Sequence, residues 1–201
     1  AVDGTVLSWS PAAPPGAPST LASGQVAEFT AAGPFSVKSQ DADHPFYLGQ
    51  YMTGCLHVQS STSEGDPEWV NVIPPQQYLR RYVFFSDPTY AETNLVVVRK
   101  RDKNTNAFAD VNLDCAGVLT GWQAIGDYEY TRIDLVTGNF QNVGGCSNGR
   151  HEISSTAPFG VTVWGWGMST TTPFTGAVSY AYPAGAGIKS INDIVVPATP
   201  K

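Results

Sequence analysis

Charged residues are scarce in this chain. Asp, Glu, Lys and Arg make up 14% of the 201 residues, against about 25% in an average soluble protein. Acids outnumber bases and the net charge is −6, which argues against nucleic acid or an anionic membrane as the main partner. Long hydrophobic runs are missing too. The longest aliphatic run, Leu95–Val98, is far shorter than the roughly 20 apolar residues of a transmembrane helix.

The motifs of common hydrolases are also missing. None of the three histidines belongs to a His-Glu-x-x-His zinc pair, and no Gly-x-Ser-x-Gly turn offers a serine nucleophile. A glycosidase would need two carboxylates that face each other across a cleft, but the carboxylates here fall mostly in turns. We therefore expect a protein that is not an enzyme.

Cysteine is rare. Three residues are too few for a disulfide scaffold and wrongly spaced for zinc. Cys115 and Cys146 both lie at expected loop ends, where a cross-link would close a loop of about 30 residues and stabilise the fold by roughly 3 kcal/mol. We predict this disulfide. The alternative is that all three thiols are reduced, and Cys55 is then a small core residue or a free thiol.

Glycine (20 residues), proline (15), tyrosine (9) and phenylalanine (9) are plentiful, a composition typical of turn-rich, extracellular β proteins. Hydrophobic alternation between Gly, Pro, Asp and Asn clusters predicts about ten short strands. They are Gln25–Thr30, Phe35–Ser39, Phe46–Met52, Trp69–Val72, Tyr78–Phe85, Asn94–Lys100, Tyr128–Leu135, Arg150–Ser154, Phe159–Gly167 and Val178–Tyr182. The only helix candidate, near Pro74–Tyr78, is one turn at best. The fold class is therefore all-β, an antiparallel β-sandwich or jelly roll.

The chain divides into three parts. Residues 1–24 are expected to be a Pro- and Ala-rich leader or linker, with room for a first strand. Residues 25–188 are expected to form the β-sandwich binding domain. Residues 189–201 are expected to be a C-terminal strand and an outgoing linker.

Aromatic residues concentrate near the end of the chain. Alternation along Phe159–Trp166 places Trp164 and Trp166 on one face of a strand, and Tyr180 and Tyr182 repeat the same two-residue spacing. These four side chains could form a platform that stacks on sugar rings or grips a protein loop. The sequence favours the other interpretation, in which one face packs against a second sheet. Trp122, beside an expected loop, is the better candidate for exposure.

One pair of acids could bind a cation. Asp41 and Asp43, next to His44, could supply oxygen ligands to calcium, but the spacing matches no recognised calcium loop. Two acids two residues apart beside a proline are more often turn formers. We therefore expect no cofactor, with calcium as the alternative.

Three segments resemble the IgGFc-binding N-terminal domain family. They are Pro74-Pro75-Gln76 before an aromatic strand, Gly149-Arg150-His151 followed by Pro158-Phe159, and Trp164-Gly165-Trp166 with Ser179-Tyr-Ala-Tyr-Pro-Ala-Gly185. The resemblance spans roughly residues 20 to 188, which are similar to the later part of that family's longer domain. It implies an extracellular, non-catalytic, β-rich adhesion or binding domain, as in bacterial surface-protein members.

Two functions remain from the sequence. The first is a secreted or cell-surface adhesion domain, one module of a larger protein, that recognises a protein or glycoprotein. The alternative is a carbohydrate-binding module that uses Trp122, Trp164, Trp166, Tyr180 and Tyr182. Both imply a protein or glycan partner.

Overall fold

The structure is a computed structural model that describes residues 1–52, 54, 65–168 and 175–188. Strands dominate it, and the expected all-β fold is confirmed. Within the described residues, the single helix is the 3-10 turn η1, Pro75–Gln77, and no helix is long and apolar enough to cross a membrane. The chain forms two compact units, one containing Ala1–Leu48 and the other Gly49–Gly187.

The smaller unit holds a three-stranded antiparallel sheet with the order β2-β1-β3. Its strands are β1 (Thr5–Ser10), β2 (Thr20–Leu21) and β3 (Ser36–Ser39). Trp9, Phe29 and Phe35 pack as a triangle, with ring centroids 5.3 to 5.7 Å apart. This unit therefore has an aromatic cluster of its own.

Nine strands of the larger unit form one antiparallel sheet. Its main path is β10-β11-β7-β13-β8-β9, with β12 beside β11, and β6 and β14 both beside β13. The strands are β6 (Leu79–Ser86), β7 (Glu92–Lys100), β8 (Val111–Leu113), β9 (Gly117–Val118), β10 (Gln123–Ile125), β11 (Tyr128–Thr137), β12 (Gln141–Asn142), β13 (Gly149–Trp166) and β14 (Ser179–Pro183).

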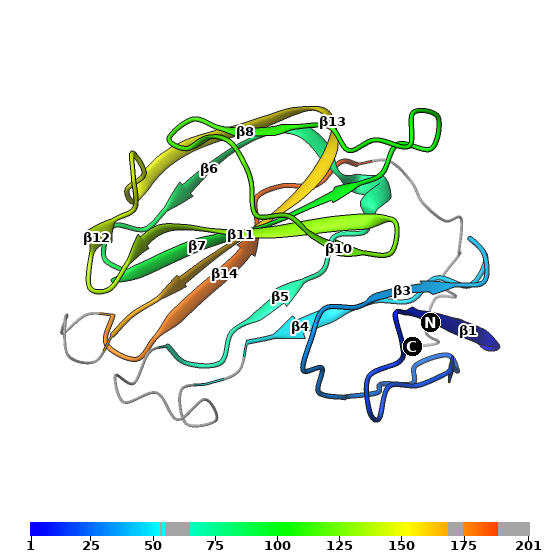
Figure 1. Ribbon diagram of the computed structural model, residues 1–201. Helices are drawn as coiled ribbons and strands as arrows, with labels where there is room; N and C mark the ends of the chain where they lie inside the picture. The colour runs from blue at the N-terminus through cyan, green and yellow to red at the C-terminus, as the bar shows by residue number, and fades with distance from the viewer. Residues whose placement is uncertain (53, 55–64, 169–174, 189–201) are drawn as a thin grey trace. The chain divides into compact units, whose positions relative to one another are not determined.

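Strand β13 belongs to two layers. Its first half pairs with β6 on one side and β8 on the other, and its second half pairs with β7 and β14. The register with β6 shifts between Ser154 and Phe159, next to Pro158, which lacks a backbone N–H donor. The strand thus turns from the first layer (β6, β8, β9) into the second (β7, β10, β11, β12, β14) and folds one sheet into a sandwich (Figure 1).

The core lies between these two layers. Phe159, Val161 and Val163 of β13 face it, as the alternation predicts. Side chains from both layers complete one buried cluster: Tyr82, Phe84, Leu95, Val97, Val111, Leu113, Leu119, Leu135, Val136, Cys146 and Ile153.

Part of the outer face of the second layer is covered as well. A separate two-stranded sheet, β4 (Gly49–Tyr51) and β5 (Trp69–Asn71), carries Val70, which is 3% exposed. A cavity of about 110 Å³, lined partly by Val70, Val96 and Thr162, lies between this sheet and β7 and β13. Part of the second layer is therefore covered on both faces.

Some strands differ from the sequence prediction. Gln25–Thr30 contains no strand, so that prediction is wrong. Arg150–Ser154 and Phe159–Gly167, expected as two strands, are parts of the single strand β13. The alternation does not predict β8, β9, β10 or β12, because strands of two or three residues are too short to show a period.

Two tyrosine hydroxyls protect the open edge of β6. The Tyr182 hydroxyl accepts the backbone N–H of Phe85 at 3.3 Å and donates to the carbonyl of the same residue. The Tyr180 hydroxyl accepts the N–H of Asp87 at 3.1 Å. Because both tyrosines come from β14, they also tie the second layer to the first, and they block part of an edge that another strand could otherwise join.

Replacement of Tyr182 by Phe should lower the free energy of unfolding by about 1 kcal/mol, because the ring stays and only the hydroxyl bonds to Phe85 are lost. Urea unfolding followed by circular dichroism measures the change. Tyr130→Phe is the matched control, since its hydroxyl contacts the exposed Gln123 side chain. Equal effects of the two substitutions would contradict a special role for the Tyr182 hydroxyl.

Candidate functional site

The outer face of the first layer carries exposed apolar side chains on its edge strand. Along β6, Tyr82 and Phe84 point into the core, whereas Val83 and Phe85 are 51% and 57% exposed. A Phe that projects from a rigid sheet is the kind of anchor that protein interfaces use. These two side chains therefore mark a candidate binding surface.

Charged side chains flank them on the same face. In the sheet register, Phe85 lies opposite Arg150 and Val83 opposite Glu152. Arg81 holds Glu152 through a fork, with Nε–Oε1 at 2.7 Å and Nη2–Oε2 at 2.8 Å. Arg150 Nη2 lies 3.7 Å from the same carboxylate. We call the five residues Arg81, Val83, Phe85, Arg150 and Glu152 the β6 face.

The β6 face is locally basic on an acidic chain. The hydrogen bond from Arg81 lowers the pKa of Glu152, so the carboxylate is ionised and neutralises one arginine. Within these five residues one positive charge is left over, both arginine side chains are about two-thirds exposed, and the nearby Asp114 carboxylate also acts on Glu152. The face therefore suits a partner that presents carboxylates around an apolar contact.

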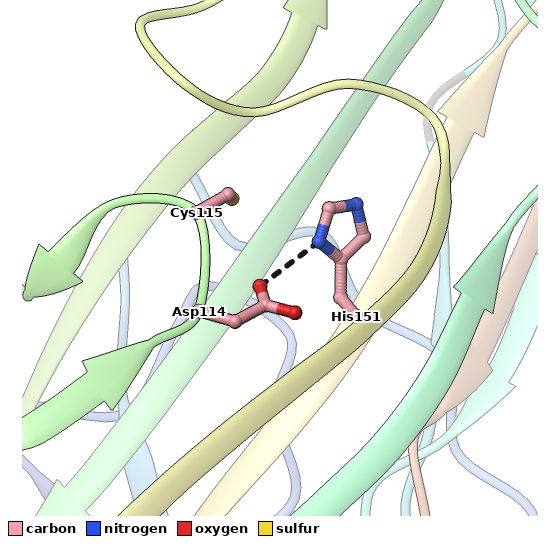
Figure 2. Close-up of side chains that lie close together, drawn as sticks. All are labelled: Asp114, Cys115 and His151. Carbon is pink, nitrogen blue, oxygen red and sulfur yellow. Dashed lines mark hydrogen bonds and ion pairs between the residues drawn. The ribbon is translucent and has the colours of Figure 1, made fainter.

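On the inner side of β13, His151 points toward Asp114 (Figure 2). Its ring is 5% exposed and lies 5.5 Å from the ring of Phe84. Nδ1 is 3.1 Å from Oδ1 of Asp114, and Nε2 is 2.7 Å from the carbonyl oxygen of Ser147. The position of His151 between two acceptors ties two loops to the strand.

Asp114 connects the turn after β8 to β13. Its Oδ2 accepts the backbone N–H of Glu152 at 2.9 Å. Burial opposes ionisation of the carboxyl group, but the hydrogen bonds from His151 and Glu152 outweigh it and lower the pKa of Asp114. The next residue, Cys115, forms a disulfide with Cys146 across 31 positions, which confirms the predicted cross-link.

Trp122 lies in the loop between β9 and β10 and is half-buried. The guanidinium carbon of Arg99 lies 3.9 Å from the centre of its ring, and its indole N–H donates to Leu119 at 2.9 Å. Arg99 is itself held by Glu129 at 2.7 Å. One face of the indole is therefore taken up by a cation–π contact within the chain.

The four aromatic residues near the end of the chain do not form one platform. Tyr182 pairs with Val163, and Tyr180 with Gly165, so both tyrosines lie on the core side of the sheet. Trp164 and Trp166 lie on the opposite side, stacked with ring centroids 6.0 Å apart. Trp164 is 4% exposed, which agrees with the interpretation that this face is packed.

Asp41 and Asp43 form a turn in the smaller unit. Oδ1 of Asp41 accepts the N–H of Asp43 at 3.0 Å and lies 2.6 Å from Nδ1 of His44. The hydrogen bond with His44 lowers the pKa of Asp41. This is the geometry of an Asx turn, and among the described residues neither acid belongs to a group of three or more metal ligands. Cys55, the third cysteine, lies outside the described residues.

Sequence reasoning missed the β6 face. The alternation in Arg81-Tyr-Val-Phe-Phe85 indicates that one face of this strand is exposed, since every second side chain must point away from the core. The sequence cannot tell which alternate set is the exposed one, because both sets contain a Phe or Tyr beside a polar or aliphatic residue. Only the layer packing decides between them.

A family model described as IgGFc binding protein matches residues 1–165. The match begins ahead of residue 20 and ends at residue 165, so the motif Ser179–Gly185 lies beyond it. No curated protein matches the chain, and no solved structure matches it.

Proposed function

Because the chain belongs to the IgGFc-binding protein family, we propose that it is a non-catalytic extracellular binding module, secreted or at the cell surface, that recognises a protein or glycoprotein. The disulfide between Cys115 and Cys146 supports an oxidising compartment. As an adhesion domain, it would be one module of a larger protein.

The observation that carries this proposal is the β6 face. Phe85 and Val83 are exposed on a sheet whose inner side is fully packed, so a ligand would meet a rigid surface. Interface hot spots are rich in aromatic residues and arginine, and Phe85 lies directly beside Arg150. A rigid anchor with a flanking cation binds at low entropic cost.

The edge geometry favours a ligand that covers the face over one that adds a strand. Strand addition to β6 needs its free N–H and C=O groups. Those of Phe85 are already bonded to the hydroxyl of Tyr182. The ligand would therefore contact side chains and leave the backbone edge alone.

The test is a binding measurement on immobilised IgG Fc fragment and on immobilised mucin glycoprotein. Phe85→Ser and Arg150→Glu should each weaken binding of the responsive probe at least tenfold, about 1.4 kcal/mol. Val118→Ser is the matched control, because Val118 is 55% exposed on β9 of the same layer but lies outside the β6 face. Its substitution should leave the affinity unchanged.

Three outcomes would count against the proposal. Unchanged affinity in both β6-face variants would remove this surface from consideration. Binding that depends on free sugar and disappears in Trp166→Ala would favour the carbohydrate-binding alternative, since Trp166 is the more exposed member of the stacked pair. If the wild-type chain binds neither probe, the ligand class of the family does not extend to it.

A further inference from the structure

Three side chains that can ligate a metal ion meet beside the first half of β13, and a fourth is bonded to one of them. Ligand atoms of Asp114, Cys115 and His151 all lie within 4.8 Å of one another (Figure 2). Cys146 is not part of this close group, but its sulfur is bonded to that of Cys115 and so lies next to it. The set contains two sulfurs, one imidazole nitrogen and one carboxylate oxygen, which is a donor set suited to zinc.

The surroundings hold two of these ligands in metal-binding orientation. Nε2 of His151 faces the carbonyl oxygen of Ser147 at 2.7 Å, so Nε2 carries the proton and Nδ1 is directed at Oδ1 of Asp114. The backbone N–H of Glu152 holds the other carboxylate oxygen at 2.9 Å. Such outer hydrogen bonds to a carbonyl and a peptide N–H are typical of metal-ligating His and Asp side chains.

The same two contacts of His151 leave a place for a cation. Both ring nitrogens face oxygen acceptors, and a neutral imidazole has only one N–H to donate. A proton on Nδ1 satisfies the Asp114 contact, and a divalent cation placed between Nδ1 and Oδ1 would satisfy it equally. Those two atoms are 3.1 Å apart, close to the roughly 3.4 Å edge of a tetrahedral zinc site with ordinary bond lengths.

We propose that Asp114, Cys115, Cys146 and His151 form a redox-gated zinc site. In the oxidised chain the two sulfurs are bonded to each other and bind no metal. Reduction by two equivalents of a thiol breaks the Cys115–Cys146 bond and yields two protein thiols and one disulfide of the reductant. Zinc then binds both sulfurs as thiolates, and two protons are released.

One ligand of the site is open to solvent and two are buried. The side chain of Asp114 is 38% exposed and that of His151 only 6%, while Cys146 is 3% exposed. A cation could therefore reach the carboxylate from water and be held against buried ligands. The ligands come from three separate segments of the chain, so cysteine spacing alone gives no sign of them. This inference does not depend on the proposed binding function.

Cobalt is the probe, because tetrahedral cobalt–thiolate sites have characteristic visible and near-ultraviolet absorption. The full chain with Cys55→Ser is reduced with a thiol and desalted, then titrated with Co²⁺ and next with Zn²⁺. We expect one cobalt per chain with a tetrahedral thiolate spectrum, displaced by one equivalent of zinc. The oxidised chain should take up none.

Variants distinguish this site from nonspecific metal binding. His151→Gln should weaken the zinc affinity of the reduced chain at least tenfold, and Asp114→Asn should do the same. Asp110→Asn is the matched control, since its carboxylate is 80% exposed and its nearest cation is Arg99 at 3.9 Å. Equal affinity in His151→Gln and the control would overturn the proposal.

Folding is measured in the same samples, because reduction alone could unfold the chain. Near-ultraviolet circular dichroism reports side-chain packing, and thermal melting reports stability. Zinc should raise the melting temperature of the reduced chain and restore its packing signal, and it should do neither in His151→Gln. A reduced chain that unfolds and is not refolded by zinc would also overturn the proposal.

Discussion

Replacement of Phe159 by Ala should lower the free energy of unfolding by about 3 to 5 kcal/mol. Phe159 is 0% exposed and lies where β13 turns from one layer into the other. Its ring packs edge-on against Tyr82, with centroids 5.1 Å apart, and the hydroxyl of Tyr82 donates to its carbonyl. The substitution leaves a cavity at the one place that both layers share.

Urea unfolding monitored by tryptophan fluorescence measures this loss. Phe85→Ala is the matched control, because it removes the same side chain from a position that is 57% exposed. It should cost less than about 1 kcal/mol while it weakens ligand binding. If Phe159→Ala and Phe85→Ala were equally destabilising, the assignment of core and outer faces would be wrong.

Replacement of Cys146 by Ser should destabilise the oxidised fold by about 3.5 to 4.5 kcal/mol. The Cys115–Cys146 bond joins residues 31 positions apart, and the unfolded chain gains the freedom of that loop when the bond is absent. Cys146 is also 3% exposed within the core cluster. The polar hydroxyl of Ser therefore adds to the loss.

Denaturant unfolding with and without a thiol reductant checks this prediction. Without zinc, the reduced wild-type chain and Cys146→Ser should have similar unfolding midpoints, and only the wild-type chain should change when the reductant is removed. If the unfolding midpoint of the wild-type chain is the same with and without the reductant, the cross-link contributes little stability.

The sequence predicts the second half of β13 well. Phe159, Val161 and Val163 alternate with small or polar residues, and β-branched residues pack well on a half-buried sheet. It does not predict that β13 is one strand, because Pro158 and the polar run before it are typical of a break. β13 continues past Pro158 because its pairing changes there, from β6 and β8 to β7 and β14.

The candidate site was less predictable than the fold. Equal spacing in Trp164, Trp166, Tyr180 and Tyr182 suggests one surface, yet faces are set by the register between β13 and β14. Each tryptophan lies opposite a small residue, Ala181 or Ser179, so the two aromatic pairs are on opposite sides. A one-residue difference in register would have brought the two pairs to the same side. The spacing of the aromatic residues does not predict this register.

The passage of β13 through both layers also has a mechanical meaning. The β6 face lies against one end of this strand, and the stacked tryptophans lie at the other end of the same peptide backbone. A pull on a ligand held by Arg150 would be carried along covalent bonds into the second layer, with strands hydrogen-bonded on either side of β13. Separation of the two layers would then require backbone hydrogen bonds on both sides of β13 to break.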